Sequence, residues 1–297
     1  MSALIDFLNF NDVEYKENLQ MKRLSPIRIG GNASIVIYPD SADKLILVID
    51  FLEERQIGYR VLGRTSNVLL PDDTINKVLV KTDKLLGVSL KDNIFTLQAG
   101  ETIARHATGL AELGFSGFLG LAGIPGTVGG MLRGNAGAFG DEIGNIVRTA
   151  KVYDPECRKI LDINASDMAL GYRRSIFQDR KYIILSVTLE LDTMSSENAA
   201  RILRENREKR MKTQPFEKPS LGSIFKRPEG DYAARLIDAA GLKGYSIGDA
   251  VVSPKHAGFI VNQSNATAKD VKLLIEHIKQ TVNDKFGVLL REEIEIL

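Results

Sequence analysis

A glycine-rich segment sets the strongest limit on how this 297-residue chain can fold, because ten of its 26 glycines lie between Gly114 and Gly140. A regular helix or strand does not tolerate this density, since each internal glycine costs about 0.5–1 kcal/mol in conformational entropy. Glycine lets the main chain adopt positive φ and lets N–H groups approach a ligand closely. Pro125 followed by Gly126 also favours a type II turn. The three-residue spacing stops at Gly129 after a single proline, which excludes a collagen helix. The segment is therefore predicted to be a ligand-binding loop rather than a bare surface loop.

Composition indicates a near-neutral chain of two-domain size. Single hydrophobic cores rarely grow beyond about 250 residues, so this length favours two domains or subdomains. Lys and Arg number 39 and Asp and Glu number 38, a balance that argues against a nucleic-acid or membrane-surface partner. No run approaches the roughly 18 apolar residues of a membrane span, and the N-terminal residues are acidic where a signal peptide is basic. We therefore expect a cytoplasmic protein.

Cysteine and histidine are too few for a disulfide framework or a metal site. Cys157 is the single cysteine, and we expect it to pack as a small apolar residue. His106, His256 and His277 lie far apart in the sequence and have no cysteine at ligand spacing, so no metal is expected.

Short β-rich runs mix with helical patterns, which indicates an α+β chain rather than regular βαβ winding. The runs are SIVIY at 34–38, YRVLG at 59–63, KVLVK at 77–81, IFTLQAG at 94–100, KVYD at 151–154 and YIILSVTLEL at 182–191. Helices are predicted from Ser41 to near Gly58, from Glu101 to Leu113, across 195–214, from Tyr232 to Ala240, and after Thr267. The helix at 195–214 is charged and is expected to join two domains. The spacing of Thr267 to Asp270 fits a capping box.

Four further segments combine glycine or proline with polar and cationic side chains: 28–33, 61–67, 171–175 and 219–228. The hydroxyl, amide and guanidinium groups of 61–67 can all hydrogen-bond phosphate oxygens. Segment 171–175 places two arginines beside a tyrosine, and 219–228 holds two serines and two cations between prolines. A turn or a charged surface would explain each segment alone. Dinucleotide-fold, P-loop and nucleophile-elbow motifs are missing from the sequence.

Taken in order, these segments resemble one enzyme family, the UDP-N-acetylenolpyruvoylglucosamine reductases (UDP-N-acetylmuramate dehydrogenases), flavoenzymes of bacterial peptidoglycan synthesis. The motifs are IRIGGNA, VLGRTSNVLL, LAGIPGTVGG, NAGAFG, GYRRSIF, PSLGSIFKRP, AGLKGYSIGDAVVSPKHAGFIVN and LLREEIEI. The resemblance runs from about Arg28 to Ile296. The short span between Tyr172 and Ser223 resembles the type that lacks an extra tyrosine-bearing loop.

The resemblance implies an α+β fold with a two-part FAD-binding domain of the vanillyl-alcohol oxidase (PCMH-type) class. This domain is expected at 1–200, with subdomains of about 1–75 and 76–200, and a smaller α+β substrate-binding domain at 201–297. The implied activity is NADPH-dependent reduction of UDP-N-acetylglucosamine enolpyruvate to UDP-N-acetylmuramate through non-covalent FAD, by a monomer. That reaction would serve cell-wall biogenesis, cell shape and cell division.

The resemblance also implies which residues hold FAD. Main-chain N–H groups can neutralise phosphate charge without a basic patch, which agrees with the near-neutral composition. The implied FAD contacts are Gly63, Arg64, Thr65, Ser66, Asn67, Gly123, Ile124, Gly126, Thr127, Gly129, Gly130, Asn135, Ala136 and Gly137.

Reduction of the enol ether needs a hydride at one alkene carbon and a proton at the other, with negative charge developing on the carboxyl oxygens. The resemblance implies that Arg173 pairs with the carboxylate and stabilises this charge. It implies that Ser223 donates the proton to the α-carbon, helped by Lys226 or an ordered water. Glu293 is expected to be protonated or to bridge through water to the carboxyl end.

Some assignments stay open at this stage. Glu292 and Glu295 compete with Glu293, and only motif alignment chooses among the three. The side chains expected to grip the nucleotide diphosphate or the carboxylate are Tyr172, Lys226 and Arg227.

Several positions depart from the family pattern without removing an assigned catalytic side chain: Thr65, Leu119, Met131, Leu132, Gly134 and Arg227. Thr65 stands where the family usually has glycine, so its loop must avoid positive φ or accept strain. Two rival interpretations are a flavin oxidase that uses oxygen and a non-catalytic flavin or nucleotide sensor. Retention of Arg173, Ser223 and Glu293 together argues against a pure binding module.

Overall fold

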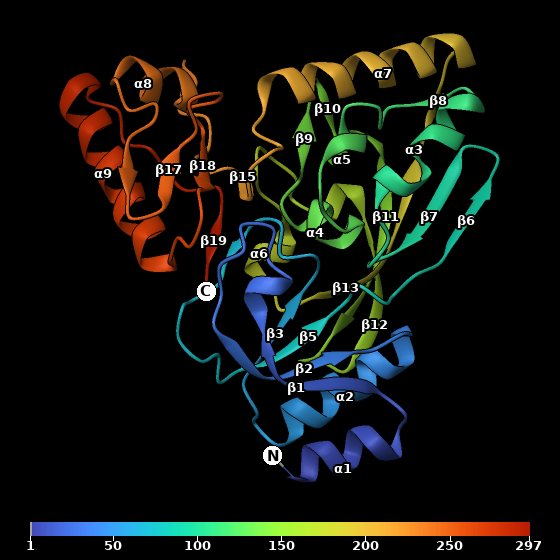
Figure 1. Cartoon of the computed structure of the whole chain (residues 1–297). Coiled ribbons are helices and arrows are strands. Elements are labelled where there is room, and N and C mark those ends of the chain that lie inside the picture. Colours follow the sequence, from blue (N-terminus) through green and yellow to red (C-terminus); the bar gives the residue numbers. More distant parts are fainter. Residues whose placement is uncertain (1) are drawn as a thin grey trace. The chain divides into compact units, whose positions relative to one another are not determined.

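The computed structural model describes residues 2–297, and the chain divides into two compact units (Figure 1). Unit 1 comprises Met1–Glu17, Ile35–Arg64 and Lys77–Glu208, and unit 2 comprises Asn18–Ser34, Thr65–Asn76 and Lys209–Leu297. Both units mix helices and strands, as the predicted α+β class requires.

The first sheet has the strand order β1-β2-β5-β3. Its strands are β1 (Glu14–Gln20), β2 (Asn32–Tyr38), β5 (Val78–Lys81) and β3 (Tyr59–Leu62), and β5 pairs in parallel with both β2 and β3. Helices α1 (Ser2–Phe10) and α2 (Ala42–Glu54) lie together against it in Figure 1. Alternate strand residues such as Ile35 and Ile37 share one core with Leu45 and Val48 of α2. Each fully buried aliphatic side chain contributes about 1.5–3 kcal/mol.

The predicted start of α2 is confirmed, and its predicted end is wrong. Ser41 is the N-cap, and its side chain accepts a hydrogen bond from the Lys44 N–H at 3.2 Å. The helix ends at Glu54 rather than near Gly58. Arg55 and Gln56 turn the chain away, with Gln56 at φ +53°, before any glycine is reached.

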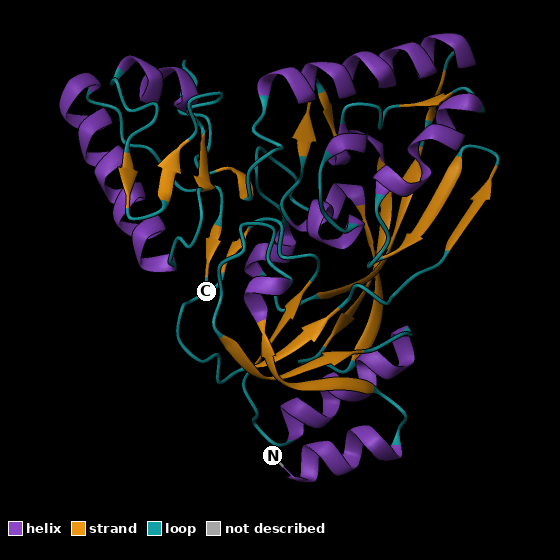
Figure 2. Ribbon diagram, in the orientation of Figure 1, coloured by secondary structure: helices purple, strands orange, loops and turns teal. Residues whose placement is uncertain are grey.

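The second sheet of unit 1 is antiparallel, with the order β12-β11-β13-β7-β6 (Figure 2). Its strands are β12 (Lys159–Asn164), β11 (Val147–Asp154), β13 (Ile183–Glu190), β7 (Ile94–Gln98) and β6 (Val88–Lys91). The helices associated with its core are α3 (Ile103–Glu112), α4 (Val128–Arg133), α5 (Ile143–Ile146), α6 (Ile176–Asp179) and α7 (Ser196–Thr213), the last of which carries residues of both units. Inward residues of β7, β11 and β13 pack with apolar residues of these helices in one core.

The glycine-rich segment connects short elements of unit 1 rather than forming a long one, as its composition predicts. These elements are β8 (Phe115–Ser116), η2 (Leu121–Gly123), α4, β9 (Gly137–Ala138) and β10 (Asp141–Glu142). The remaining short elements of the unit are η3 (Ala165–Asp167) and β14 (Asp192–Thr193), which pairs with β8.

Unit 2 is built on a four-stranded antiparallel sheet of order β15-β18-β17-β16. Its elements are η1 (Met21–Arg23), β4 (Val68–Leu69), β15 (Ser220–Ser223), α8 (Ala233–Ala239), β16 (Ser246–Ile247), β17 (Ala250–Val252), β18 (Phe259–Asn262), α9 (Ala268–Phe286) and β19 (Glu295–Ile296). In Figure 1, α9 runs beside β17, and Val271, Leu274 and Ile278 of its buried stripe join the core of the unit. The predicted capping box of Thr267 and Asp270 is present in full.

The expectation that Cys157 packs as a small apolar residue is wrong. Cys157 is exposed in the turn between β11 and β12. Its flanking residues Glu156 and Arg158 are exposed as well, so the thiol lies at the polar tip of the turn and not in a core.

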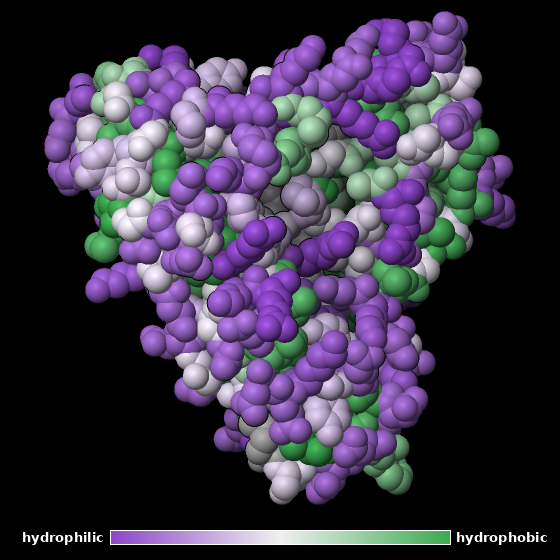
Figure 3. Space-filling view, in the orientation of Figure 1, coloured by the Kyte–Doolittle hydropathy of each residue, from purple (hydrophilic) through white to green (hydrophobic). Residues whose placement is uncertain are grey.

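Exposed apolar side chains gather on β6 and the loop before it, at the right-hand side of Figure 3. They are Leu86, Val88 and Leu90, which are 40–47% exposed. None of the helices formed by residues 2–297 combines the length and the apolarity needed to cross a bilayer.

Candidate active site

Many glycines of the predicted cofactor loop serve close packing of the main chain. A Cβ atom on Gly120 would lie 2.2 Å from the Ala138 carbonyl oxygen, and one on Gly63 would lie 2.5 Å from Oγ1 of Thr127. Both distances are too short for any side chain, so glycine is required at these two positions. Gly63 and Thr127 are thereby brought together inside unit 1, joining two segments for which FAD contacts are predicted.

Thr127 begins α4 and shapes the turn at its start. Its side chain accepts a hydrogen bond from the Gly130 N–H at 3.3 Å, so Thr127 is the N-cap. The neighbouring N–H groups of Val128 and Gly129 donate to carbonyls of Glu101 and Ala99 at 2.7 and 3.1 Å. Within residues 2–297 the Thr127 N–H has no acceptor of its own. A main-chain N–H without an acceptor, placed at a tightly packed glycine turn, can donate to a phosphate oxygen. The segment therefore fits a dinucleotide such as FAD.

The 65–67 segment belongs to unit 2 and offers similar donors. The N–H groups of Ser66 and Asn67 donate no hydrogen bond to any acceptor in the described chain. The Asn67 side chain donates from Nδ2 to the Glu293 carbonyl at 2.9 Å, and the main-chain carbonyl of Asn67 accepts from the Glu295 N–H at 2.9 Å. Asn67 therefore ties this segment to the C-terminal strand, where the candidate acids lie.

Thr65 accepts the backbone strain that its position implies. Its φ is +55°, in the left-handed region where a β-branched residue is an outlier. The side chain is buried, and Oγ1 donates to the Leu24 carbonyl at 3.1 Å. That hydrogen bond offsets part of the strain, and the loop keeps the backbone shape that glycine would adopt without cost.

Arg173 is bonded to the glycine-rich segment within unit 1. Its guanidinium donates from Nη2 to the Gly137 carbonyl at 3.0 Å and from Nη1 to the Asn135 carbonyl at 3.3 Å. The residue has φ +52°, and its Cζ lies 5.3 Å from the centroid of the Tyr172 ring. The predicted arginine and two of the predicted cofactor residues therefore occupy one place in the unit.

Asn135 and Ser175 hold these two segments together. The Asn135 side chain is almost fully buried; it donates from Nδ2 to the Gly171 carbonyl at 2.9 Å and accepts from the Gly144 N–H at 3.0 Å. Ser175 donates from Oγ to the Arg133 carbonyl at 2.6 Å. These contacts indicate that the Asn135 side chain positions the loops around Arg173, a role that the sequence pattern did not reveal.

Ser223 and Glu293 are close in the main chain of unit 2. Ser223 ends β15, directly after Gly222 at φ +82°. The Glu293 N–H donates to the carbonyl of Ile224, the residue after Ser223, at 2.7 Å. Lys226 follows in the same pairing, since its N–H donates to the Arg291 carbonyl at 2.8 Å.

The three competing acids have different surroundings. Glu292 accepts a hydrogen bond from Nζ of Lys279 at 2.9 Å. Burial raises the pKa of Glu292, but the hydrogen bond from Lys279, a backbone hydrogen bond and the charge of Lys279 together outweigh burial and hold that pKa below its usual value. Glu292 is thus a paired carboxylate, poorly suited to proton transfer. Glu295 lies in β19, which pairs with β4.

The candidate substrate residues Lys226 and Arg227 follow Ser223 in the chain. Lys226 is half-buried and Arg227 is exposed. The Arg227 guanidinium lies over the ring of Tyr232, with Cζ 4.7 Å from its centroid. Stacking of this kind keeps a cationic side chain ordered at the surface.

Each of the three histidines has a structural contact. His106 lies 3.1 Å from Oε2 of Glu101, Nδ1 of His256 accepts from the Gly258 N–H at 3.2 Å, and His277 stacks on Tyr245 at 4.3 Å. Residues 2–297 contain no group of three His, Cys, Asp or Glu side chains able to hold a metal ion.

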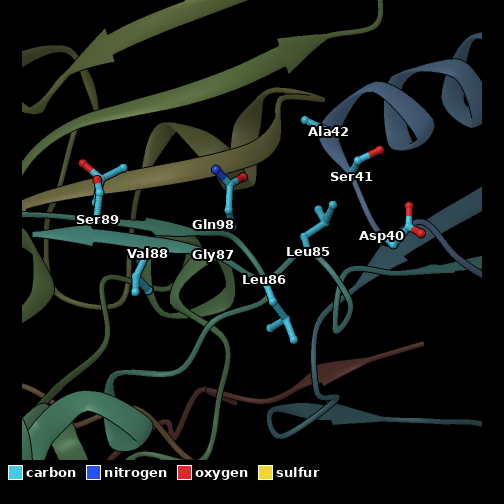
Figure 4. Close-up of a pocket in the computed structure, with 10 residues that line it drawn as sticks. Asp40, Ser41, Ala42, Leu85, Leu86, Gly87, Val88, Ser89 and Gln98 are labelled. Carbon is cyan, nitrogen blue, oxygen red and sulfur yellow. The ribbon is translucent and has the colours of Figure 1, made fainter.

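A pocket of about 430 Å³ lies between the start of α2 and the β6–β7 hairpin of unit 1 (Figure 4). Asp40, Ser41, Leu85 and Gln98 are among the residues that line it. None of its lining residues belongs to the predicted cofactor, catalytic or substrate sets.

Comparison with known proteins defines the class. A family model described as "FAD binding domain" matches residues 33–158. The structure of a berberine bridge enzyme variant, a reticuline dehydrogenase, shares the fold over 65% of this chain and 44% of its own, with a TM-score of 0.50 at 15% identity. With the glycine turn at Thr127, these matches define a protein with the two-part FAD-binding domain of the vanillyl-alcohol oxidase (PCMH-type) class.

Comparison with relatives identifies one family within this class. A family model for the C-terminal domain of UDP-N-acetylenolpyruvoylglucosamine reductase matches residues 214–297. Enzymes of that name are 38% identical in Caldicellulosiruptor saccharolyticus, over 96% of this chain and 93% of the relative, and 40% identical in Caldanaerobacter subterraneus, over 94% and 92%. The crystal structure of UDP-N-acetylenolpyruvylglucosamine reductase from Thermus caldophilus is 30% identical, with a TM-score of 0.80 over 96% of this chain and 98% of that one. The chain belongs to the UDP-N-acetylenolpyruvoylglucosamine reductase family.

Family membership fixes the overall reaction. The protein reduces UDP-N-acetylglucosamine enolpyruvate to UDP-N-acetylmuramate in peptidoglycan precursor synthesis, with FAD as cofactor and NADPH as reductant. The expected family, fold class, cofactors and small-molecule substrate are thus confirmed.

Proposed function

We propose that Arg173, Ser223 and Glu293 carry out the steps of the reduction that fall to the protein. FAD, when bound, supplies the hydride that it has received from NADPH. The observation that carries the proposal is the pair of hydrogen bonds from Arg173 to the Gly137 and Asn135 carbonyls. They fix the guanidinium on the glycine-rich segment, so a substrate carboxylate that binds Arg173 also lies beside the ligand of that segment.

Arg173 stabilises the negative charge that develops on the substrate carboxylate. A guanidinium carries five N–H donors, so it can bind two carbonyls and a carboxylate at once. Donors held by the fold before the reaction stabilise such charge at little reorganisation cost. The strained φ of +52° at Arg173 agrees with this role, because strain of this kind is kept where function requires it.

Ser223 donates a proton to the α-carbon of the substrate. A serine hydroxyl is a weak acid, so Lys226 or an ordered water assists it. Glu293 is protonated or bridges through water to the carboxyl end. Pairing of Glu293 with Ile224 and of Lys226 with Arg291 keeps these side chains on neighbouring stretches of unit 2, which supports their joint assignment.

Cofactor and substrate contacts are assigned by motif. The diphosphate of FAD is bound by segment 63–67 and by the segment from Gly123 to Gly137, where N–H groups and tight glycine turns suit phosphate. Tyr172, Lys226 and Arg227 hold the nucleotide diphosphate or the carboxylate of the substrate. The functional division into a cofactor domain at 1–200 and a substrate domain at 201–297 is part of the same proposal.

The cellular role follows from the reaction. We infer a cytoplasmic monomer whose product supports cell shape and cell division through cell-wall synthesis. Oxidation of NADPH that depends on added UDP-N-acetylglucosamine enolpyruvate tests the proposal, with Arg173→Met as the variant. If the variant no longer oxidises NADPH in response to the enolpyruvyl substrate, the result supports the proposal. A wild-type rate of substrate-dependent oxidation in the variant refutes the role of Arg173.

A further inference from the structure

Lys81, which ends β5, is a fully buried cation for which the reaction has no assigned use. Its side chain is 1% exposed. Its Nζ donates a hydrogen bond to the Gly63 carbonyl and lies 3.2 Å from Oδ2 of Asp83. Lysine is almost never fully buried without a partner, because removing its charge from water is costly. The position therefore needs an explanation, and the contact with Gly63 connects it to the predicted cofactor segment.

Stability alone does not explain Lys81. The second carboxyl oxygen of Asp83, Oδ1, is buried and has no hydrogen-bond partner within residues 2–297. An ion pair that leaves one oxygen unsatisfied recovers less than its desolvation costs, and replacing such pairs by apolar groups is often neutral or stabilising. Burial lowers the pKa of Lys81, and Asp83 offsets only part of that effect.

The hydrogen bond to Gly63 sets the direction of the next N–H group. The C=O and N–H of a trans peptide point in opposite directions, and the described chain has no cis peptide bond. With the Gly63 carbonyl turned toward Lys81, the Arg64 N–H points away from it. The other side of Gly63 is closed by Thr127, which a Cβ atom would approach to 2.5 Å. Lys81 and Thr127 together hold this peptide plane.

We propose that Lys81 is a positioning residue for the cofactor, orienting the Gly63–Arg64 peptide so that its N–H faces the diphosphate of FAD and placing a positive charge behind it. The inference rests on the proposed assignment of segment 63–67 to that diphosphate. It concerns binding, so it can be tested without turnover.

Lys81→Met removes the charge and the hydrogen bond while keeping most of the side-chain volume. Lys84→Met is the matched control, because Lys84 is exposed, lies three residues further on and pairs with Glu14. FAD affinity of the apoprotein is measured by quenching of flavin fluorescence, and the apoprotein melting temperature is measured in parallel. We expect Lys81→Met to weaken FAD binding about 10- to 100-fold. Its melting temperature should fall, because Asp83 is left without its partner. Lys84→Met is expected to match wild type.

A second variant separates positioning from folding. Lys81→Met combined with Asp83→Asn removes both charges of the pair, of which only Lys81 is fully buried, so no uncompensated charge remains. Weak FAD binding at a wild-type melting temperature supports the inference. A lowered melting temperature in both variants, or FAD affinity within about twofold of wild type in Lys81→Met, overturns it. If wild type itself fails to bind FAD, the proposed cofactor assignment fails instead.

The pH dependence of binding gives an independent readout. The charged groups that act on Lys81 are Asp83, which raises its pKa, and Arg64, which lowers it. Tyr38 stays neutral, since burial and the nearby charges of Asp83 and Glu14 raise its pKa to about 12. Wild-type FAD affinity should fall as the pH rises through the lowered pKa of Lys81. Lys81→Met should show no such step, and the same step in that variant contradicts the inference.

Discussion

Arg173 donates a hydrogen bond from Nη2 to the carbonyl of Gly137 at 3.0 Å, so the arginine proposed for catalysis is bonded to the glycine-rich segment itself. A Cβ atom on Gly137 would lie 2.7 Å from Cγ of Glu142 and 3.0 Å from the Asp141 carbonyl oxygen, so a side chain there would push these neighbours away. The close approach that places the Gly137 carbonyl against Arg173 therefore depends on glycine.

Replacing Arg173 by lysine should slow reoxidation of the reduced flavin by the substrate about 100- to 1000-fold. Lysine keeps the charge but loses the planar fork that bonds two carbonyls and a carboxylate. FAD affinity should stay near wild type, as measured by fluorescence titration. Arg174→Lys is the control, since Arg174 is exposed and pairs loosely with Asp179 at 3.7 Å. Equal slowing in both variants would show that Arg173 does not have its assigned role.

Ser223→Ala should separate the two half-reactions. Bleaching of the flavin by NADPH should proceed at the wild-type rate, because this step needs no proton from Ser223. Recovery of the oxidised flavin on adding the enolpyruvyl sugar should slow about 100- to 10 000-fold, the range for loss of a general acid. Both rates are followed by stopped-flow absorbance, with Ser220→Ala in the same strand as control. Loss of both half-reactions would count against the assignment.

The competing acids are distinguished by a pair of matched variants. Glu293→Gln should slow the substrate half-reaction and leave NADPH bleaching intact. Glu292→Gln should leave both half-reactions unchanged and lower the free energy of unfolding by less than about 1 kcal/mol, because it breaks only the partly exposed pair with Lys279. If Glu292→Gln slowed reoxidation while Glu293→Gln did not, the two roles would have to be exchanged.

Two substitutions at Thr65 test whether its positive φ is strained. Thr65→Ala loses the hydrogen bond to Leu24 and keeps a Cβ atom at positive φ, whereas Thr65→Gly loses the same bond but is relieved of the strain. The glycine variant should therefore unfold with a free energy about 1 kcal/mol higher than the alanine variant. This reverses the usual order of the two residues. Urea denaturation of the apoproteins measures it, and an alanine variant as stable as the glycine variant would show that Thr65 is unstrained.

The regular elements were largely predictable because their signals are local. The capping box of Thr267 and Asp270 and the apolar stripe from Val271 specify α9 without reference to the rest of the chain. Strand β1 was missed, since its sequence EYKENLQ is polar and carries no alternating pattern. It forms through pairing within its sheet, which a local reading does not detect.

The motifs predicted which residues belong to the candidate site, but not the contacts that these residues make. The resemblance selected Arg173, but nothing in GYRRSIF indicated that its guanidinium bonds to carbonyls about 40 residues earlier in the chain. Lys81 was visible only as the charged end of the run KVLVK, where a lysine is normally exposed. Its burial depends on the carbonyl of Gly63 and on Asp83, contacts that only the folded chain provides.

The most direct test of the reductase assignment is the visible flavin absorbance of the purified protein, followed without oxygen while NADPH and then UDP-N-acetylglucosamine enolpyruvate are added. The reductase assignment requires bleaching of the flavin band by NADPH and its recovery on adding the enolpyruvyl sugar. A protein that bleaches but recovers only when oxygen is admitted, or one that takes up no FAD, would contradict it.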